Sequence, residues 1–303
     1  MPDNQDSRAA RVARFTRYGW GVLGYNLLVI LWGASVRATG SCAGCELTHR
    51  TTSGLALAAV VLLMFWARRL FAPGSTTRRA AHAAMVLMVT EALVSAGLVL
   101  FEMVADNDSV ARAYWLAAHL FNTFLLIAAI ALVPWFASGH RAPKIRGGGR
   151  SVTLLACSLV GLLLLGMTGA VTALGDTLFP SATLAEGLAQ DLSPTAHWLI
   201  RLRVIHPILA VLVGGMILLT AGVVSRDHPS RTTQDLGLGL AVLVAAQLIA
   251  GLMNLMLLAP VWMQLVHLLL ADVVWVVLVR LGAAGLALGA PRTDVKVKPV
   301  TAV

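Results

Sequence analysis

Charged residues are scarce in this sequence of 303 residues, because Asp, Glu, Lys and Arg together make up only 12% of it. Soluble domains contain about 25% of these residues, most of them on the surface that faces water. Hydrophobic residues make up 58% of the chain, and the mean hydropathy is +0.81. The composition therefore excludes an ordinary water-soluble core and favours an integral protein of the lipid bilayer.

Acidic residues are the scarcer charge, with 14 Asp and Glu against 23 Lys and Arg and a formal net charge of +9. Such an excess can indicate nucleic-acid binding, but the basic residues lie in short segments between apolar runs. No basic face with interleaved aromatic residues is present, so we exclude nucleic acid as a partner. We interpret the basic segments as signals of membrane topology.

Cysteine is rare as well, and the chain contains only three. Cys157 lies within an apolar run and is expected to be a small buried hydrophobic residue. Cys42 and Cys45 lie in a short linker that we place on the oxidising side of a bacterial plasma membrane. We favour a disulfide or redox pair between them, and two free thiols are the alternative.

Apolar runs are abundant, and each is close to the roughly 20 residues that a helix needs to cross a hydrocarbon core. The predicted fold class is all-α, a polytopic membrane protein with eight transmembrane helices. The first span follows a polar, arginine-rich segment without a cleavage site, so we expect it to be retained. The spans are expected near residues 18–37, 48–67, 81–103, 113–136, 152–173, 198–223, 235–258 and 262–285.

The linkers between the spans alternate in charge, which sets the predicted orientation. Basic linkers follow spans two, four and six, whereas acidic residues follow spans three and five. By the positive-inside rule the basic linkers and both termini are cytoplasmic. The predicted location is therefore the cell's plasma membrane, with spans two, four, six and eight beginning at the outer face.

Three consecutive glycines, 147–149, divide the chain into two four-helix halves, residues 1–145 and 146–303. The halves resemble weak parallel repeats, because a Gly-Ala pair at Gly33 ends the first span and another at Gly169 ends the fifth. We therefore expect two copies of one helical site, one in each half.

Four of the eight histidines lie near the outer ends of the even-numbered spans: His49, His119, His206 and His267. A polar side chain within the bilayer is costly and usually functional, and two imidazoles on facing helices can ligate a haem from both sides. The alternative is that each histidine bonds to a neighbouring helix, but their matching depth in both halves favours haem. His82 and His197 fall outside the repeat and are expected to be interfacial or structural.

The halves differ three residues before the first histidine of each pair, where Glu46 precedes His49 but Arg203 precedes His206. Residues i and i+3 share a helix face, so a carboxylate overlooks one site and a guanidinium the other. Glu46 can accept protons during oxidation of a haem substituent. It can instead cap its helix or pair with Arg50.

Arginines near the outer face oppose the positive-inside trend and require anionic partners: Arg37, Arg50, Arg201 and Arg203. Haem propionates are suitable, because arginine binds carboxylates in bidentate fashion, and acids of the outer linkers are the alternative. Pro207 is expected to bend the sixth span. Glu91, Asn122 and Asp272 are further polar residues within spans, with Asp272 either supporting His267 or bonding between helices.

Five segments together resemble the haem A synthase family: Gly33-Ala-Ser-Val-Arg-Ala-Thr-Gly-Ser41, Glu46-Leu-Thr-His49-Arg50, His119-Leu-Phe-Asn122, Arg203-Val-Ile-His206-Pro207 and His267-Leu-Leu-Leu-Ala-Asp272. Their order and topology make the match specific, although the family often has a longer first outer loop with more widely spaced cysteines. The resemblance implies oxidation of the C8 methyl group of haem O, through an alcohol, to the formyl group of haem A for terminal oxidases.

The resemblance also assigns roles to the residues that match the motifs. It implies that His49 and His119 bind the substrate haem, with Glu46 as the catalytic carboxylate. It implies that His206 and His267 hold a haem b that passes electrons. Haem O synthase and an electron acceptor are the expected partners, and the chain is compatible with an oligomer.

Two other functions are compatible with paired histidines. A dihaem cytochrome b would only move electrons, but its haems are expected at two depths, whereas these histidines all lie toward one face. A haem transporter would have broken helices and a midplane site, and Pro207 is the one candidate break that the sequence offers.

Overall fold

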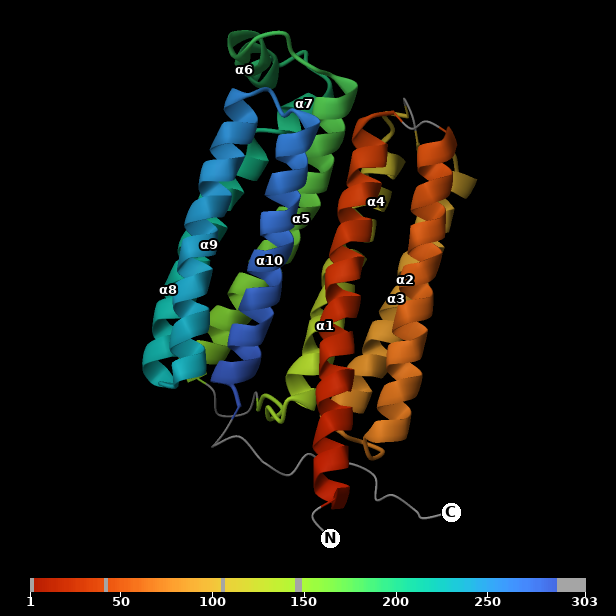
Figure 1. Cartoon of the computed structure of the whole chain (residues 1–303). Coiled ribbons are helices and arrows are strands. Elements are labelled where there is room, and N and C mark those ends of the chain that lie inside the picture. Colours follow the sequence, from red (N-terminus) through yellow and green to blue (C-terminus); the bar gives the residue numbers. More distant parts are fainter. Residues whose placement is uncertain (1–2, 41–42, 105–106, 145–148, 288–303) are drawn as a thin grey trace.

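The computed structural model describes residues 3–40, 43–104, 107–144 and 149–287, and the regular elements within these ranges are α-helices (Figure 1). Eight spans in the described part of the chain are long and apolar enough to cross a membrane. The prediction of an all-α, multi-pass membrane protein with eight spanning helices is confirmed.

The spanning helices of the first half of the chain are α1 (Asp3–Ala38), α2 (Ala43–Leu70), α3 (Thr76–Leu100) and α4 (Val110–Ala137). In the second half they are α5 (Gly149–Leu178), α8 (Ile205–Asp227), α9 (Arg231–Met256) and α10 (Val261–Gly285). Two short helices, α6 (Leu184–Leu192) and α7 (Trp198–Leu202), connect α5 to α8.

Consecutive spanning helices run antiparallel and form one elongated bundle, with α1 to α4 on one side and α5 to α10 on the other (Figure 1). Helices α6 and α7 lie at one end of this bundle, which we call the α6 end. Helices α2, α4, α8 and α10 all begin near the α6 end, whereas α1 begins at the opposite end (Figure 1). Side chains near the start of these four helices therefore lie at similar depth.

Helix α4 is the central helix of the bundle. Over the most apolar 18 residues of α4, 61% of the residues are buried inside the bundle. The corresponding share is 17% to 39% in the other seven spans. It also connects the two halves, because Nε1 of Trp275 in α10 donates to the backbone oxygen of Phe124 in α4 at 2.6 Å. The two aromatic rings stack with their centroids 5.4 Å apart. The halves are therefore in contact through packed aromatic rings and a buried hydrogen bond.

Several helices begin where a hydroxyl side chain satisfies free backbone N–H groups. The side chain of Ser109 accepts from the backbone N–H of Arg112 at the start of α4. Ser230 and Thr233 bond reciprocally at the start of α9. Such caps stabilise helix ends in the polar region outside the hydrocarbon core, where water competes for the same groups.

Three features differ from the sequence prediction. Helix α1 begins at Asp3, well before the first apolar residue of its span, and the connection after α5 contains the unpredicted helix α6. The predicted sixth span is interrupted at Arg203 and Val204. Pro207 lies in the first turn of α8, directly after the interruption. It has no N–H to donate to the backbone oxygen of Arg203 four residues earlier, so the interruption lies where this proline would break the span.

Cys157 was expected to be buried, but it is exposed on the surface of α5. Large apolar side chains are also exposed along the spanning helices, among them Leu62, Val160 and Leu219. A bundle in lipid has no reason to bury every apolar side chain, because hydrocarbon solvates them. An apolar run therefore does not establish that a small residue within it faces the protein interior.

Candidate functional site

The four predicted histidine ligands lie in the half of the bundle nearest the α6 end. His49, His119 and His267 are six to nine residues beyond the first residues of α2, α4 and α10, and His206 is the second residue of α8. At about 1.5 Å per residue the first three lie roughly 9 to 14 Å along their helices. His206 is eight residues beyond Trp198, the first residue of its span, so its position along the span falls in the same range.

The imidazole rings of His206 and His267 lie close together in the second half. Their centroids are 6.4 Å apart and their planes are inclined at 78°. An imidazole nitrogen binds a metal ion at about 2 Å, so two rings on opposite sides of one ion have centroids roughly 6 Å apart. The observed spacing fits one metal ion between the two rings.

Glycines press against both rings of this second pair. A methyl group on Gly169 of α5 would come within 3.0 Å of Cε1 of His206, and one on Gly251 of α9 within 3.1 Å of Cε1 of His267. Each ring also has a neutral polar neighbour, with Thr168 Oγ1 3.1 Å from Nδ1 of His206. The amide nitrogen of Gln247 lies 3.3 Å from Nε2 of His267.

The first pair, His49 and His119, shares with the second pair a glycine packed against its first histidine. The two histidines are close enough to interact electrostatically. A methyl group on Gly33 of α1 would come within 2.6 Å of Cε1 of His49, so the ring packs directly against the α1 backbone. Gly33 and Gly169 were matched in the predicted repeat, and each lies against the first histidine of its own half.

Nδ1 of His49, His119 and His267 is buried and makes no hydrogen bond to another described residue. Buried nitrogens without partners are costly, and ligands or solvent commonly satisfy them. In the described part of the chain no group of three or more His, Cys, Asp or Glu side chains is placed to hold a bare metal ion. Two imidazoles instead suit a metal whose other ligands come from a macrocycle, so these residues fit haem.

A polar network surrounds His119. Oε1 of Glu91, in α3, lies 3.5 Å from Nδ1 of His119. The carboxylate accepts from Nδ2 of Asn122 at 2.6 Å and from the hydroxyl of Thr123. Glu91 and Asn122 were recognised in the sequence as polar residues within spans, but their association with His119 was not predicted.

Glu46 forms an ion pair with Arg50 one turn further along α2. Its side chain is 42% exposed, and it lies in the first turn of the helix. This is the pairing expected from the sequence as the alternative to a catalytic role. The two are compatible, since an exposed ion pair is weak and leaves the carboxylate accessible.

The four arginines have different surroundings. Arg37 donates to the backbone oxygen of Ala173 and to Thr177, both in α5. Arg203 donates to the backbone oxygens of Gly175 and Phe179. Arg201 is exposed and forms no ion pair within the described part of the chain.

Acids near the α6 end complete the surroundings of Arg203. Its Nε is 3.4 Å from Asp176 and its Nη1 is 3.9 Å from Asp191. Burial raises the pKa of the Asp191 carboxyl, while the Arg203 guanidinium acts to lower that pKa. Arg203 therefore pairs with acids near the linkers, which was the expected alternative to pairing with haem propionates.

His197 has the structural role expected of it. Its Nδ1 accepts from the backbone N–H of Leu199 at the start of α7, and its Nε2 lies 3.4 Å from Asp108. Cys42 lies outside the described residues, so its pairing with Cys45 stays a prediction. Thr168 and Gln247 were missed in the sequence, although a glutamine within an apolar span was a signal available for Gln247.

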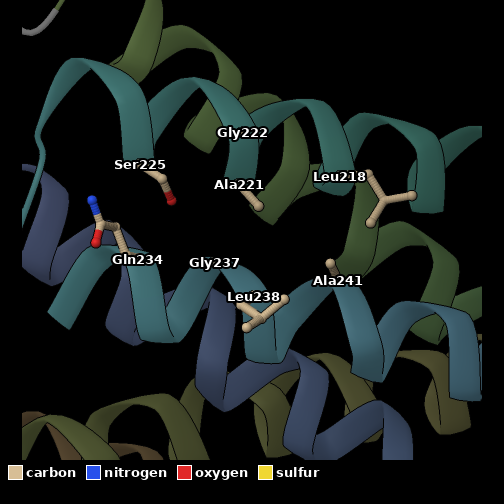
Figure 2. Close-up of a pocket in the computed structure, with 8 residues that line it drawn as sticks. All are labelled: Leu218, Ala221, Gly222, Ser225, Gln234, Gly237, Leu238 and Ala241. Atoms are coloured by element: carbon tan, nitrogen blue, oxygen red, sulfur yellow. The ribbon is translucent and has the colours of Figure 1, made fainter. Parts of the chain in front are cut away.

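A pocket between α8 and α9 is separate from the histidines (Figure 2). It has a volume of about 310 Å³ and is lined by small and apolar residues such as Ala221, Gly222 and Leu238. Gly222 lies sixteen residues beyond His206 in α8, which is roughly 24 Å along the helix. The pocket therefore does not belong to the histidine sites.

Comparison with known proteins places this arrangement in a family. Two proteins of Thermus thermophilus, one from each of two strains, are each 47% identical over 305 residues and bear the name protoheme IX farnesyltransferase. The matches include 93% of this chain but 50% of each relative, so the chain spans about half the length of the curated relatives it matches. A family model described as cytochrome oxidase assembly protein, COX15-CtaA, matches residues 45–279, which include all four histidines. The chain belongs to this family, the haem A synthase family.

Proposed function

We propose that the protein is a haem A synthase, which oxidises the C8 methyl group of haem O to a formyl group. The observation that supports it most directly is the 6.4 Å spacing of His206 and His267, together with a second histidine pair at the same end of the bundle. Membership of the family supports a haem-modifying role. The oxidation itself is our inference.

In this proposal His206 and His267 hold a haem b, and His49 and His119 hold the substrate haem O. Haem supplies the redox chemistry when bound, since iron between two imidazoles exchanges electrons without changing its ligands. The protein contributes the orientation of three of the imidazoles, His49, His206 and His267, through the glycines packed against them. It also contributes a mostly apolar environment that excludes water.

Glu46 is proposed as the catalytic carboxylate. Conversion of a methyl group and one water to a formyl group releases four protons and four electrons. An exposed carboxylate three residues before His49 can accept protons at the edge of the site and pass them to solvent. Arg50 holds this carboxylate by the ion pair on the same helix face. A haem held by His206 and His267 would supply the electron-transfer chemistry, and an electron acceptor is a required partner.

The names of the relatives support the choice of substrate. Both Thermus thermophilus relatives are named for transfer of a farnesyl group to protoheme IX, and each is about twice the matched length. We infer that a farnesylating enzyme, a haem O synthase, supplies the substrate and is a partner. We also propose that the protein lies in the plasma membrane, with both termini cytoplasmic and the α6 end facing outward.

The test is to express the protein with a haem O supplier and identify the extracted pigments by chromatography and mass spectrometry. Haem A or its alcohol intermediate is expected. A Glu46→Ala protein should lose the product by about 100-fold or more while it keeps both haems, as expected for loss of proton transfer. Asp235→Asn is the matched control, because Asp235 is exposed in the first turns of α9 at the far end of the bundle.

One outcome would contradict the synthase activity, and two would contradict the role of Glu46. A folded protein that contains only haem b and unmodified haem O would instead be an electron carrier. Loss of both haems in the Glu46→Ala protein would assign Glu46 a structural role. Retention of full product by that variant would exclude it as the catalytic carboxylate.

A further inference from the structure

We propose that Glu91 is a positioning residue that orients His119 and strengthens it as a haem ligand. In this proposal the carboxylate accepts a hydrogen bond from Nδ1 of the imidazole, so that Nε2 points toward the iron. The inference rests on the proposed function, which assigns His119 to the substrate haem.

The geometry around Glu91 is that of a preformed acceptor. Its side chain is 16% exposed, and Oε1 lies 3.5 Å from Nδ1 of His119. That nitrogen is buried and makes no hydrogen bond to any described residue. A small rotation of either side chain is enough to bring the two atoms into hydrogen-bond range.

Two further side chains hold the carboxylate in place. Asn122 donates to Oε2 and also to the backbone oxygen of Leu87, so it fixes Glu91 to its own helix. Thr123 donates to Oε1 of Glu91 and also to the backbone oxygen of His119. Both donors are almost completely buried. A carboxylate within a membrane span is costly, and a set of donors directed at it indicates a function.

The carboxylate makes the two histidine pairs chemically different. His206 and His267 have the neutral neighbours Thr168 and Gln247. Within the described residues Glu91 is the only carboxylate within 4 Å of any of the four ligand histidines.

An anionic acceptor on Nδ1 increases the basicity of a ligating imidazole and stabilises the more oxidised metal. The first site should therefore have the lower reduction potential, and electrons should pass from it to the second site. That direction agrees with a substrate that is oxidised in the first half.

The experiment compares purified full-length proteins with bound haem by potentiometric titration and electron paramagnetic resonance. Glu91→Gln should raise the midpoint potential of one haem only, change its ferric spectrum, and weaken its retention by about 10- to 100-fold. Glu91→Asp keeps the charge, so its midpoint potentials should stay closer to those of the unmodified protein. The control is Thr90→Val, since Thr90 bonds only within its own helix.

Unchanged midpoints and spectra in the Glu91→Gln protein would overturn the proposal. Equal shifts of both haems together with a lower melting temperature would also overturn it, because they indicate a purely structural role. If Glu91→Gln does not accumulate, Glu91→Asp decides the matter. Its shorter side chain moves the carboxylate away from Nδ1 of His119, so a midpoint potential that does not rise there refutes the physical argument.

The outcomes separate this inference from the proposed function. A protein that leaves haem O unmodified but shows the selective midpoint shift would contradict the synthase activity and support the role of Glu91. Formation of haem A without a shift in midpoint potential would support the synthase activity and contradict the role of Glu91. A folded protein that binds no haem would overturn both.

Discussion

The contact between Gly33 and His49 makes a quantitative prediction for the substitution Gly33→Ala. The added methyl group would lie 2.6 Å from Cε1 and 2.9 Å from Nε2 of His49. Non-bonded carbon atoms prefer about 3.5 to 4.0 Å, so the overlap is roughly 1 Å. Overpacking of this kind costs about 1–3 kcal/mol. Because the imidazole is a side chain and can rotate, we expect the ring to move and α1 to stay in place.

The consequence of this movement is a loss of haem from the first site without a comparable loss of fold. At about 1.4 kcal/mol for each factor of ten, the expected decrease in haem affinity is roughly 5- to 140-fold. The assay is a haem titration of the purified protein followed by absorption, combined with the melting temperature.

The matched control for this prediction is Gly24→Ala in the same helix, where an added methyl group meets nothing within 4 Å. This variant should bind haem normally and melt at the same or a slightly higher temperature, because alanine favours helix by up to about 1 kcal/mol. Full haem binding with an unchanged spectrum in the Gly33→Ala protein would refute the reasoning.

Two further predictions follow from the second half. Gly169→Ala should weaken the site of His206 by less than Gly33→Ala weakens the first site, because its methyl group would stop 3.0 Å from the ring; a haem titration checks this. Arg203→Gln should lower the free energy of unfolding by about 3–5 kcal/mol, since it leaves the half-buried Asp176 without its ion pair. The exposed Arg201→Gln should change it by no more than about 0.5 kcal/mol, as thermal unfolding in detergent can measure.

The number of helices and their class could be predicted because a spanning helix needs a fixed length of apolar sequence. Their ends could not be predicted to the residue, since helices extend beyond the hydrocarbon core into polar sequence, as α1 does at Asp3. The interruption before α8 could be predicted in kind but not to the residue. Pro207 indicated a break, and a proline lacks the N–H that would bond to the residue four positions earlier, so the interruption lies one turn upstream at Arg203 and Val204.

The common depth of the four histidines could be predicted from the rise of a helix, but their neighbours could not. The rotation of a helix about its own axis is normally read from an apolar stripe, and spans that are apolar on all sides have none. For this reason Glu91 was recognised as a polar residue in a span, while its contact with His119, twenty-eight residues away, needed the structure. The same holds for Gln247 and His267.

The repeat predicted from the sequence agrees with one feature that the two sites share, and the sites differ in another. A glycine of the preceding helix lies against the first histidine in each half, at Gly33 and Gly169, because only a residue without a side chain lets the backbone approach the ring so closely. The contact between glycine and histidine depends on backbone geometry, so two halves with the same helix arrangement are expected to share it. The polar neighbour of the second histidine depends on one side chain, and here the halves differ, because Glu91 lies beside Nδ1 of His119 and Gln247 beside Nε2 of His267. Under the proposed function, one fold would hold two haems at a similar depth and give them different electronic properties through the side chains beside their ligands.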